Sequence, residues 1–249
     1  MTALTSSAPV APATVPSTTG ATRAAGVLLI VDALLACAPV IVLGAAIGWP
    51  ASLGKPAADQ LALIHAHADA VTLGYGLYLL YSLLVAPALI GLAAAVFGGL
   101  QRPLAAVVAA FAALSALARA IGILRWLTVM PALAAAHATA DAPSRAQIEV
   151  LFGAITLYGG GIGEVLGVSL LMAAALGTLC AGAWLQQAMP RVLAVTGLLV
   201  ALMLAALSAR TFGAPALMPV AVAVTSLSLW MLACGVWLLR RPKVQHRVP

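Results

Sequence analysis

The sequence predicts an all-α protein, a polytopic bundle of transmembrane helices with six spans and with both termini in the cytoplasm. Composition is the first reason: 64% of the 249 residues are hydrophobic and only 7% are charged, whereas soluble domains have roughly 45–50% apolar and about 25% charged residues. The second is that apolar stretches of about 20 residues, the length that crosses a hydrocarbon core, recur along nearly the whole chain after Arg23. These stretches leave no room for a separate soluble domain.

Span positions follow from hydropathy along the chain. Residues 1–22 are rich in Ser, Thr, Pro and Ala and lack the basic start of a signal peptide, so we expect a disordered cytoplasmic tail. The transmembrane domain is predicted at 23–241, and residues 242–249 are expected to be a basic cytoplasmic tail. The six spans are predicted at about 24–49, 72–99, 103–131, 148–185, 191–212 and 216–239.

Several segments carry features that interrupt a regular helix. Pro39 predicts a kink in span one, because proline cannot donate a hydrogen bond to the carbonyl four residues earlier. Residues 57–71 are polar enough to lie outside the membrane as an extension of the second helix. The polar stretch 137–147 predicts the longest internal loop, and the glycines at 159–161 interrupt span four and would permit an unwound segment.

Orientation follows from the basic residues, because Lys and Arg in short loops stay on the cytoplasmic side. Six spans place only Lys55 and Arg145 on the outer side. The residues on the other side are Arg23, Arg102, Arg191, Arg240, Arg241, Lys243 and Arg247. Splitting one of the two long segments, 57–99 or 148–185, would put basic residues on both sides. Splitting both gives eight spans and restores the asymmetry, so eight remains the alternative.

Ionisable residues inside the spans are the candidates for function, because each costs at least about 2.5–3.5 kcal/mol at mid-bilayer. They are Asp32, Arg119, Arg125, Glu164 and Arg210. Counting from the cytoplasmic ends places the last four in the outer half, with Arg125 and Glu164 both about 33 Å up and able to pair.

These outer residues support two interpretations. In the first, the three arginines offer planar donors to an anionic group in a vestibule that faces outward, and Glu164 sets their geometry. In the second, the arginines reach toward lipid phosphates and one Arg–Glu pair joins two helices. Asp32 would take up a proton or a cation if it faced the bundle interior, and would otherwise cap a helix or reach the near interface.

A weaker group of candidates concerns metal binding. His65, Asp69 and His137 are predicted on the outer face, and imidazole and carboxylate groups are ligands for zinc or copper. His67 points away from its neighbours at helical spacing, and a site would need His137 folded back, so surface residues are the favoured interpretation. The three cysteines lack paired spacing and are expected to be small buried hydrophobes. No cofactor is predicted.

Aromatic residues of the outer half are expected to be interfacial anchors and packing residues. They are Tyr75, Tyr78, Tyr81 and Trp126.

Two motifs support a family resemblance. Span three contains an internal arginine in LARAIGILRW, after a short basic turn, and span four contains an acidic residue in the tyrosine–glycine segment LYGGGIGEVLG. With two long final spans, this layout resembles bacterial six-span membrane proteins of a domain-of-unknown-function family. Arg119 would match the arginine of that pattern and Glu164 roughly its acidic position. The resemblance implies the fold and brings no established activity. Ala-rich, Lys-poor usage resembles that of a high-GC bacterium, and we expect a multi-pass protein of the cytoplasmic (inner) membrane.

Three classes of function remain. The favoured hypothesis is binding or transport of a small anionic or amphipathic ligand or lipid from the outer face, through Arg119, Arg125, Glu164 and Arg210. The alternatives are a non-enzymatic accessory or regulatory subunit, which would pair with a membrane protein or with itself through a small-residue helix face, and an enzyme at the outer leaflet. Enzyme motifs such as HExxH, GxSxG and the Walker loop are absent from the sequence, so a non-enzyme is favoured. The dispersed basic residues predict no nucleic-acid partner.

Overall fold

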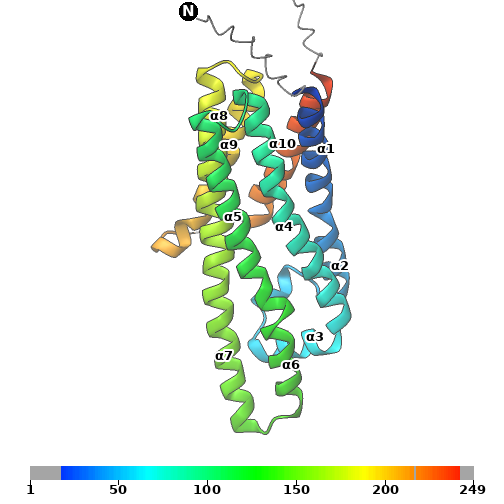
Figure 1. Cartoon of the computed structure of the whole chain (residues 1–249). Coiled ribbons are helices and arrows are strands. Elements are labelled where there is room, and N and C mark those ends of the chain that lie inside the picture. Colours follow the sequence, from blue (N-terminus) through cyan, green and yellow to red (C-terminus); the bar gives the residue numbers. More distant parts are fainter. Residues whose placement is uncertain (1–17, 216, 242–249) are drawn as a thin grey trace, which may run out of the picture.

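The computed structural model describes residues 18–215 and 217–241, with the side chains of residues 18, 19 and 210 left out. It is a bundle of helices (Figure 1). The longer helices are α1 (Thr18–Leu35), α2 (Cys37–Ile47), α4 (Ala68–Phe97), α5 (Pro103–Leu127), α6 (Val129–Thr139), α7 (Ala142–Gly160), η2 (Gly161–Leu171), α8 (Met172–Leu185), α9 (Arg191–Leu207) and α10 (Val220–Arg240). The shorter ones are η1 (Ala51–Gly54), α3 (Ala57–Ala66) and η3 (Ser208–Phe212).

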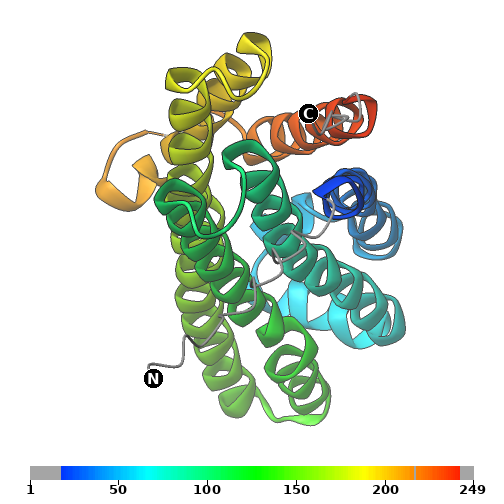
Figure 2. The ribbon, with the colours of Figure 1, turned by 45° about the horizontal axis from the view of Figure 1, so that its top comes forward.

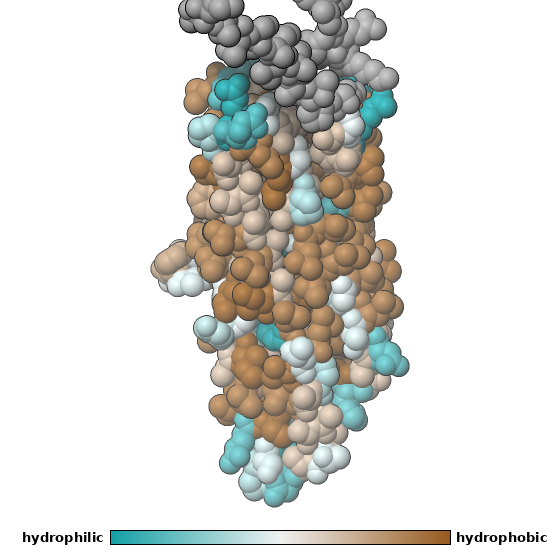
Figure 3. Space-filling view, in the orientation of Figure 1, coloured by the Kyte–Doolittle hydropathy of each residue, from teal (hydrophilic) through white to brown (hydrophobic). Residues whose placement is uncertain are grey.

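In the part of the chain that the structure describes, five helical segments are long and apolar enough to cross a membrane. They are Gly20–Ile47, Ala68–Phe97, Pro103–Thr139, Ala142–Leu185 and Val220–Arg240. The fifth predicted span, about 191–212, corresponds to α9, a shorter apolar helix of 17 residues, and Figure 1 shows that its connection to α10 lies part-way along the bundle. On this face apolar residues cover most of the length, while hydrophilic residues gather toward both ends (Figure 3). The chain is therefore a multi-pass membrane protein of the helical-bundle class.

Around the axis of the bundle, each helix packs on the next, and together they form a closed ring. α1 packs on α4, α4 on α5, α5 on η2 and α8, α8 on α9, α9 on α10, and α10 again on α1. Figure 2 shows α10 beside α1 and the α7–α8 helix on the far side of α5. Because α9 and α10 are short, the part of α7 farthest from the termini lacks their cover.

The kinked first span is confirmed, and the tail boundary is corrected. α1 ends at Leu35 and α2 begins at Cys37, so the break lies one turn before Pro39, whose ring excludes the carbonyl of residue 35 from the helix. The predicted tail at 1–22 is too long, because Thr18 already begins α1. Residues 1–17 and the predicted tail at 242–249 lie outside the described residues.

Two other segment predictions are wrong in their local structure, and a third is correct only in part. The stretch 57–71 is no simple extension of the second helix, because His67 has the non-helical angles φ −125° and ψ 34° and separates α3 from α4. The predicted loop at 137–147 is helical except for Ala140 and Asp141. The glycines at 159–161 do interrupt the regular α-helix, because α7 ends at Gly160 and the π-helix η2 begins at Gly161, but the segment stays helical and is not unwound.

Asp141 explains why the expected loop is so short. The Ser144 backbone N–H donates a hydrogen bond of 3.1 Å to Asp141 Oδ1, which caps α7, and Pro143 falls in its first turn. The hydrogen bonds from Ser144 lower the pKa of Asp141 below its ordinary value. The cap therefore stabilises the helix above the unfolded pKa of about 3.9 and is lost as the pH falls through the lower folded pKa.

We expect Asp141→Ala to fray the first turn of α7 without affecting the rest of the bundle. Hydrogen exchange followed by mass spectrometry should show faster exchange near residues 142–146, and acidification should produce the same change in the wild type. Asp59→Ala is the control, because Asp59 lies in the first turn of α3 and caps nothing. Unchanged exchange at α7 in Asp141→Ala would contradict the capping role.

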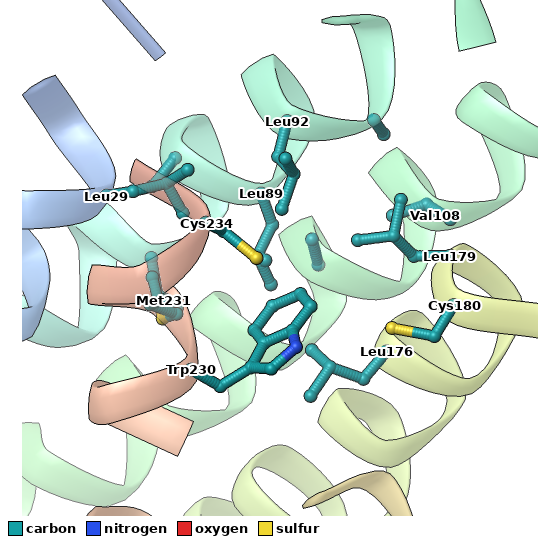
Figure 4. Packing of buried hydrophobic residues seen from close by; sticks show 14 of the residues in the cluster. Leu29, Leu89, Leu92, Val108, Leu176, Leu179, Cys180, Trp230, Met231 and Cys234 are labelled. Atoms are coloured by element: carbon teal, nitrogen blue, oxygen red, sulfur yellow. The ribbon is translucent and has the colours of Figure 1, made fainter. Parts of the chain in front are cut away.

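The main core lies at the end of the bundle nearer the termini. Trp230 of α10 points into the ring and donates a hydrogen bond of 2.8 Å from Nε1 to the Leu193 carbonyl. Leucine side chains and the thiols of Cys180 and Cys234 surround it (Figure 4). These two cysteines are buried as predicted, whereas Cys37 is exposed.

Candidate functional site

Glycines bring α5 and η2 into direct backbone contact. A Cβ atom built on Gly122 of α5 would lie 2.7 Å from the Gly163 Cα and 2.9 Å from the Gly159 carbonyl oxygen. One built on Gly167 would lie 2.8 Å from Cγ of Arg119. The glycine-rich segment is thus a packing surface, and it allows the long side chains of α5 to pass beside η2.

Tyrosines from α4 form the opposite wall. Tyr75, Tyr78 and Tyr81 recur every three residues and share one face of the helix. The Tyr75 ring stacks on Trp126 of α5, with centroids 4.8 Å apart and planes 1° apart, and Trp126 meets Phe152 of α7 edge-on. The prediction of packing residues is confirmed for Tyr75, Tyr81 and Trp126, which are buried.

Arg119 and Arg125 of α5 enter this space between the tyrosines and η2. The Arg119 residue is only 2% exposed, its guanidinium carbon lies 4.5 Å from the centroid of the Tyr81 ring, and its Nε has no hydrogen-bond partner. Arg125 lies 5.5 Å over the Trp126 ring and donates a hydrogen bond of 2.9 Å to the Gly122 carbonyl.

Glu164 of η2 is the acidic residue beside Arg125. Its Oε1 lies 4.0 Å from Arg125 Nη2, at the limit of an ion pair, and its side chain is 64% exposed while that of Arg125 is 10% exposed. The predicted pairing of Arg125 with Glu164 is therefore present as a loose contact. Such a contact contributes about 0–1 kcal/mol and leaves the guanidinium donors of Arg125 available.

These groups surround a small open pocket between α4, α5 and η2. Its cavity volume is about 40 Å³, where one water needs roughly 10–15 Å³, so it has room for a few waters or one small polar group. It is lined by Tyr75, Tyr78, Arg119, Gly122, Ile123, Arg125, Trp126, Gly163, Glu164 and Val168. Arg119 stands 16 residues after Pro103 and α9 has 17 residues, so the pocket begins near the level where α9 ends.

The structure brings together three of the four residues predicted to bind a ligand, namely Arg119, Arg125 and Glu164. Arg210 lies in η3, which packs on η2, but its side chain is outside the described residues. Sequence reasoning missed Tyr78 as a lining residue. The three-residue spacing of the tyrosines was the available signal, because it places them on the helix face opposite Arg119.

The candidate metal ligands do not form a centre within the described residues. His65 is exposed on α3 and Asp69 is exposed on α4, on either side of the break at His67. His137 Nε2 lies 3.0 Å from Glu149 Oε1, and Arg145 donates a hydrogen bond to the His137 carbonyl. No group of three or more His, Cys, Asp or Glu residues in the described part could hold a metal ion.

Buried polar residues from four elements lie deeper in the bundle. The Ser115 hydroxyl donates a hydrogen bond of 2.8 Å to the Gly167 carbonyl, and Ser82 and Ser169 are also buried. Asp32 of α1 is 0% exposed, and neither of its carboxylate oxygens has a hydrogen-bond partner. The structure thus turns Asp32 into the bundle rather than toward an interface.

Comparison with known proteins identifies the chain at the level of the family. No curated protein and no solved structure matches it significantly. A family model described as "Domain of unknown function (DUF4386)" matches residues 24–241, which include the pocket and all of the long apolar helical segments except the first four residues of Gly20–Ile47. The expected resemblance to an uncharacterised membrane family is confirmed. The chain belongs to the DUF4386 family.

Proposed function

We propose that this protein binds a small anionic group, a carboxylate or a phosphate, in the pocket between α4, α5 and η2. The observation that carries the proposal is that two guanidinium groups, from Arg119 and Arg125, line one pocket beside a single loosely held carboxylate. Guanidinium groups match planar and tetrahedral oxyanions with paired donors, and the burial of Arg119 strengthens that attraction.

The balance of charge supports an anion rather than a cation. The aromatic faces that would otherwise attract a cation are occupied by the protein's own guanidinium groups, Arg119 over Tyr81 and Arg125 over Trp126. Glu164 is mostly exposed, and its Oε1 lies 4.0 Å from Arg125 Nη2. An incoming oxyanion would therefore replace a weak contact of Arg125 and give Arg119 a partner for its free Nε.

The size and lining of the pocket indicate the ligand class. A cavity of about 40 Å³ accommodates a head group and not a complete organic molecule. Tyr75, Ile123, Trp126 and Val168 add apolar surface to the same lining, so the remainder of an amphipathic ligand would extend along it. Both an anionic lipid and a small free anion present the required chemistry.

The membrane context of the proposal is the bacterial cytoplasmic membrane, with both termini inside and the pocket in the outer half. Supporting it, Arg102, Arg191, Arg240 and Arg241 lie at the ends of helices on the side of the termini, the side that the positive-inside rule places in the cytoplasm. A ligand would reach the pocket from the outer leaflet or from outside the cell.

Native mass spectrometry of the purified protein tests this function. We expect wild type in nanodiscs that contain phosphatidylglycerol to retain one tightly bound lipid, or wild type in phosphatidylcholine nanodiscs with added sulfate to retain the anion. The first result identifies a lipid head group and the second a free anion. Arg125→Gln should reduce occupancy by roughly tenfold, since a charged hydrogen bond contributes about 1.5–3 kcal/mol.

Arg102→Gln is the matched control, because it removes the same charge from an exposed position at the start of α5. Equal loss of binding in both variants would point to general surface attraction. A protein that carries neither probe in any nanodisc would overturn the proposal and favour the accessory-subunit alternative, which predicts a protein partner or a second copy in the same spectra. Turnover of a bound lipid would favour the outer-leaflet enzyme.

A further inference from the structure

Asp32 is a buried acid that the proposed pocket does not use. It lies on α1, four residues before the break between α1 and α2, and is 0% exposed. Neither Oδ1 nor Oδ2 has a hydrogen-bond partner. A buried carboxyl group without hydrogen bonds is costly to keep unless its charge can be neutralised or has a function.

Among the described side chains, one charged group is found in the surroundings of Asp32. Gly91 of α4 faces Ala25, and Gly74 faces Leu43, so Asp32 lies beside the middle of α4, far from Asp69 at its start. Gly235 of α10 faces Leu29 and Ile30, which leaves Arg240 toward the other end. α2 carries no charged residue. At this level of α4 the guanidinium of Arg119 lies 4.5 Å from the centroid of the Tyr81 ring, and among the described side chains Arg119 is the charged group that acts on Asp32.

Arg119 therefore takes part in two environments. On one side its charge acts on Asp32, and Asp32 acts on it in return. On the other side it lines the pocket with Arg125. Tyr78 and Tyr81 are the titratable groups of α4 that face it, and Tyr81 lies directly under its guanidinium. A change of charge on either side of Arg119 is felt on the other.

We propose that Asp32 is a proton-binding site linked to the pocket through Arg119, so that the protein binds its anion together with a proton. This inference rests on the proposed anion-binding function. When Asp32 is ionised it competes with the ligand for the charge of Arg119. When Asp32 carries a proton, the whole charge of Arg119 acts on the anion, which binds more tightly.

The same linkage holds in reverse. An anion in the pocket offsets the charge of Arg119, which otherwise stabilises the Asp32 carboxylate, and Asp32 then takes up a proton. Because binding free energies are reciprocal, the factor by which the proton strengthens anion binding equals the factor by which the anion strengthens proton binding.

A proton fits the site better than a metal cation. The pocket lining does not include Asp32, and no metal-holding cluster exists among the described residues. A sodium ion needs several oxygen ligands and room for them, and the nearby charge of Arg119 would repel it. A proton needs neither, since it binds an existing oxygen of the carboxyl group.

Sulfate binding as a function of pH tests the inference, because sulfate keeps its charge and has the tetrahedral shape of a phosphate group. We expect equilibrium dialysis of labelled sulfate to show affinity at least about fivefold higher at about pH 5.5 than at about pH 8.5. Asp32→Asn mimics the protonated acid and should bind with the high affinity at both pH values. Glu164→Gln, which removes the other acid near the pocket, should keep the pH dependence.

A second measurement needs no variant. Sulfate added to the wild type in weakly buffered solution should raise the pH through proton uptake, with no dependence on sodium. A pH dependence that persists in Asp32→Asn, or disappears only in Glu164→Gln, would overturn the linkage while leaving anion binding intact. Pocket binding without proton uptake would do the same. Sulfate that binds neither wild type nor Asp32→Asn at any pH would overturn the pocket itself and the linkage with it.

Discussion

Gly122→Ala is expected to lower the stability of the bundle by about 1–3 kcal/mol, the cost of forcing an extra carbon into a filled interior. The new Cβ would lie 2.7 Å from the Gly163 Cα and 2.9 Å from the Gly159 carbonyl oxygen. Both obstacles are backbone atoms, so no rotamer change relieves the contact, and α5 and η2 must move apart. Gly122 and Gly163 also line the pocket, so sulfate binding should be lost as well.

Thermal unfolding of the detergent-purified protein checks this result, with roughly 2–4 °C of Tm expected per kcal/mol for a chain of this size. Gly153→Ala is the control, because Gly153 lies on α7 with nothing within 4 Å of the new Cβ. Alanine favours a helix over glycine by about 0.5–1 kcal/mol, so the control should be neutral or slightly more stable. Equal behaviour of the two variants would show that the close approach of α5 to η2 is wrong.

Arg119→Met is expected to destabilise the protein by about 3–5 kcal/mol, the usual cost when the removal of one charge leaves another charge buried and uncompensated. Methionine fills part of the space but leaves Asp32 without the one positive charge in its range among the described side chains. It also removes the guanidinium from the Tyr81 ring. The loss should therefore exceed that of Arg125→Met, whose partner Glu164 is mostly exposed and remains solvated.

The double variant Asp32→Asn/Arg119→Met separates these contributions. If the cost of Arg119→Met comes mainly from an uncompensated acid, the double variant should recover a large part of the lost Tm, and the two substitutions should show a coupling of roughly 0.5–3 kcal/mol. Strictly additive Tm changes would mean that Arg119 stabilises the bundle through Tyr81 and not through Asp32.

The sequence alone predicted which charged residues lie within the spans and how deep in the membrane they lie. Arg125 and Glu164 were expected at the same depth because helical rise is constant, and their atoms lie 4.0 Å apart. Counting residues gives the depth of a side chain along the helix, but it does not show which way the side chain points around the helix axis. Asp32 and Arg119 turn inward, whereas Glu164 remains exposed, and each outcome depends on which neighbour covers that face.

The break in the helix before Pro39 was predicted correctly, whereas the irregular segments expected at 159–161 and 137–147 remained helical, and the difference has a physical reason. Proline acts through its own ring, so the interruption before Pro39 followed from the sequence alone. Glycine only permits an irregular conformation, and the backbone contact with Gly122 kept the glycines at 159–161 within a continuous helix. The polar stretch 137–147 also remained helical, because Asp141 caps a new helix within two residues of the previous one.

The sequence by itself determined that this is a multi-pass membrane protein of helical spans, because hydropathy and the need to satisfy every backbone group in lipid leave few other structures. It also determined which ionisable residues the membrane must accommodate. Only the tertiary structure decided that Arg119, Arg125 and Glu164 share one pocket with tyrosines of α4, and that Asp32 is buried without a hydrogen-bond partner. Those relations join residues distant in the chain, and they arise from glycine-mediated helix packing that no single span encodes.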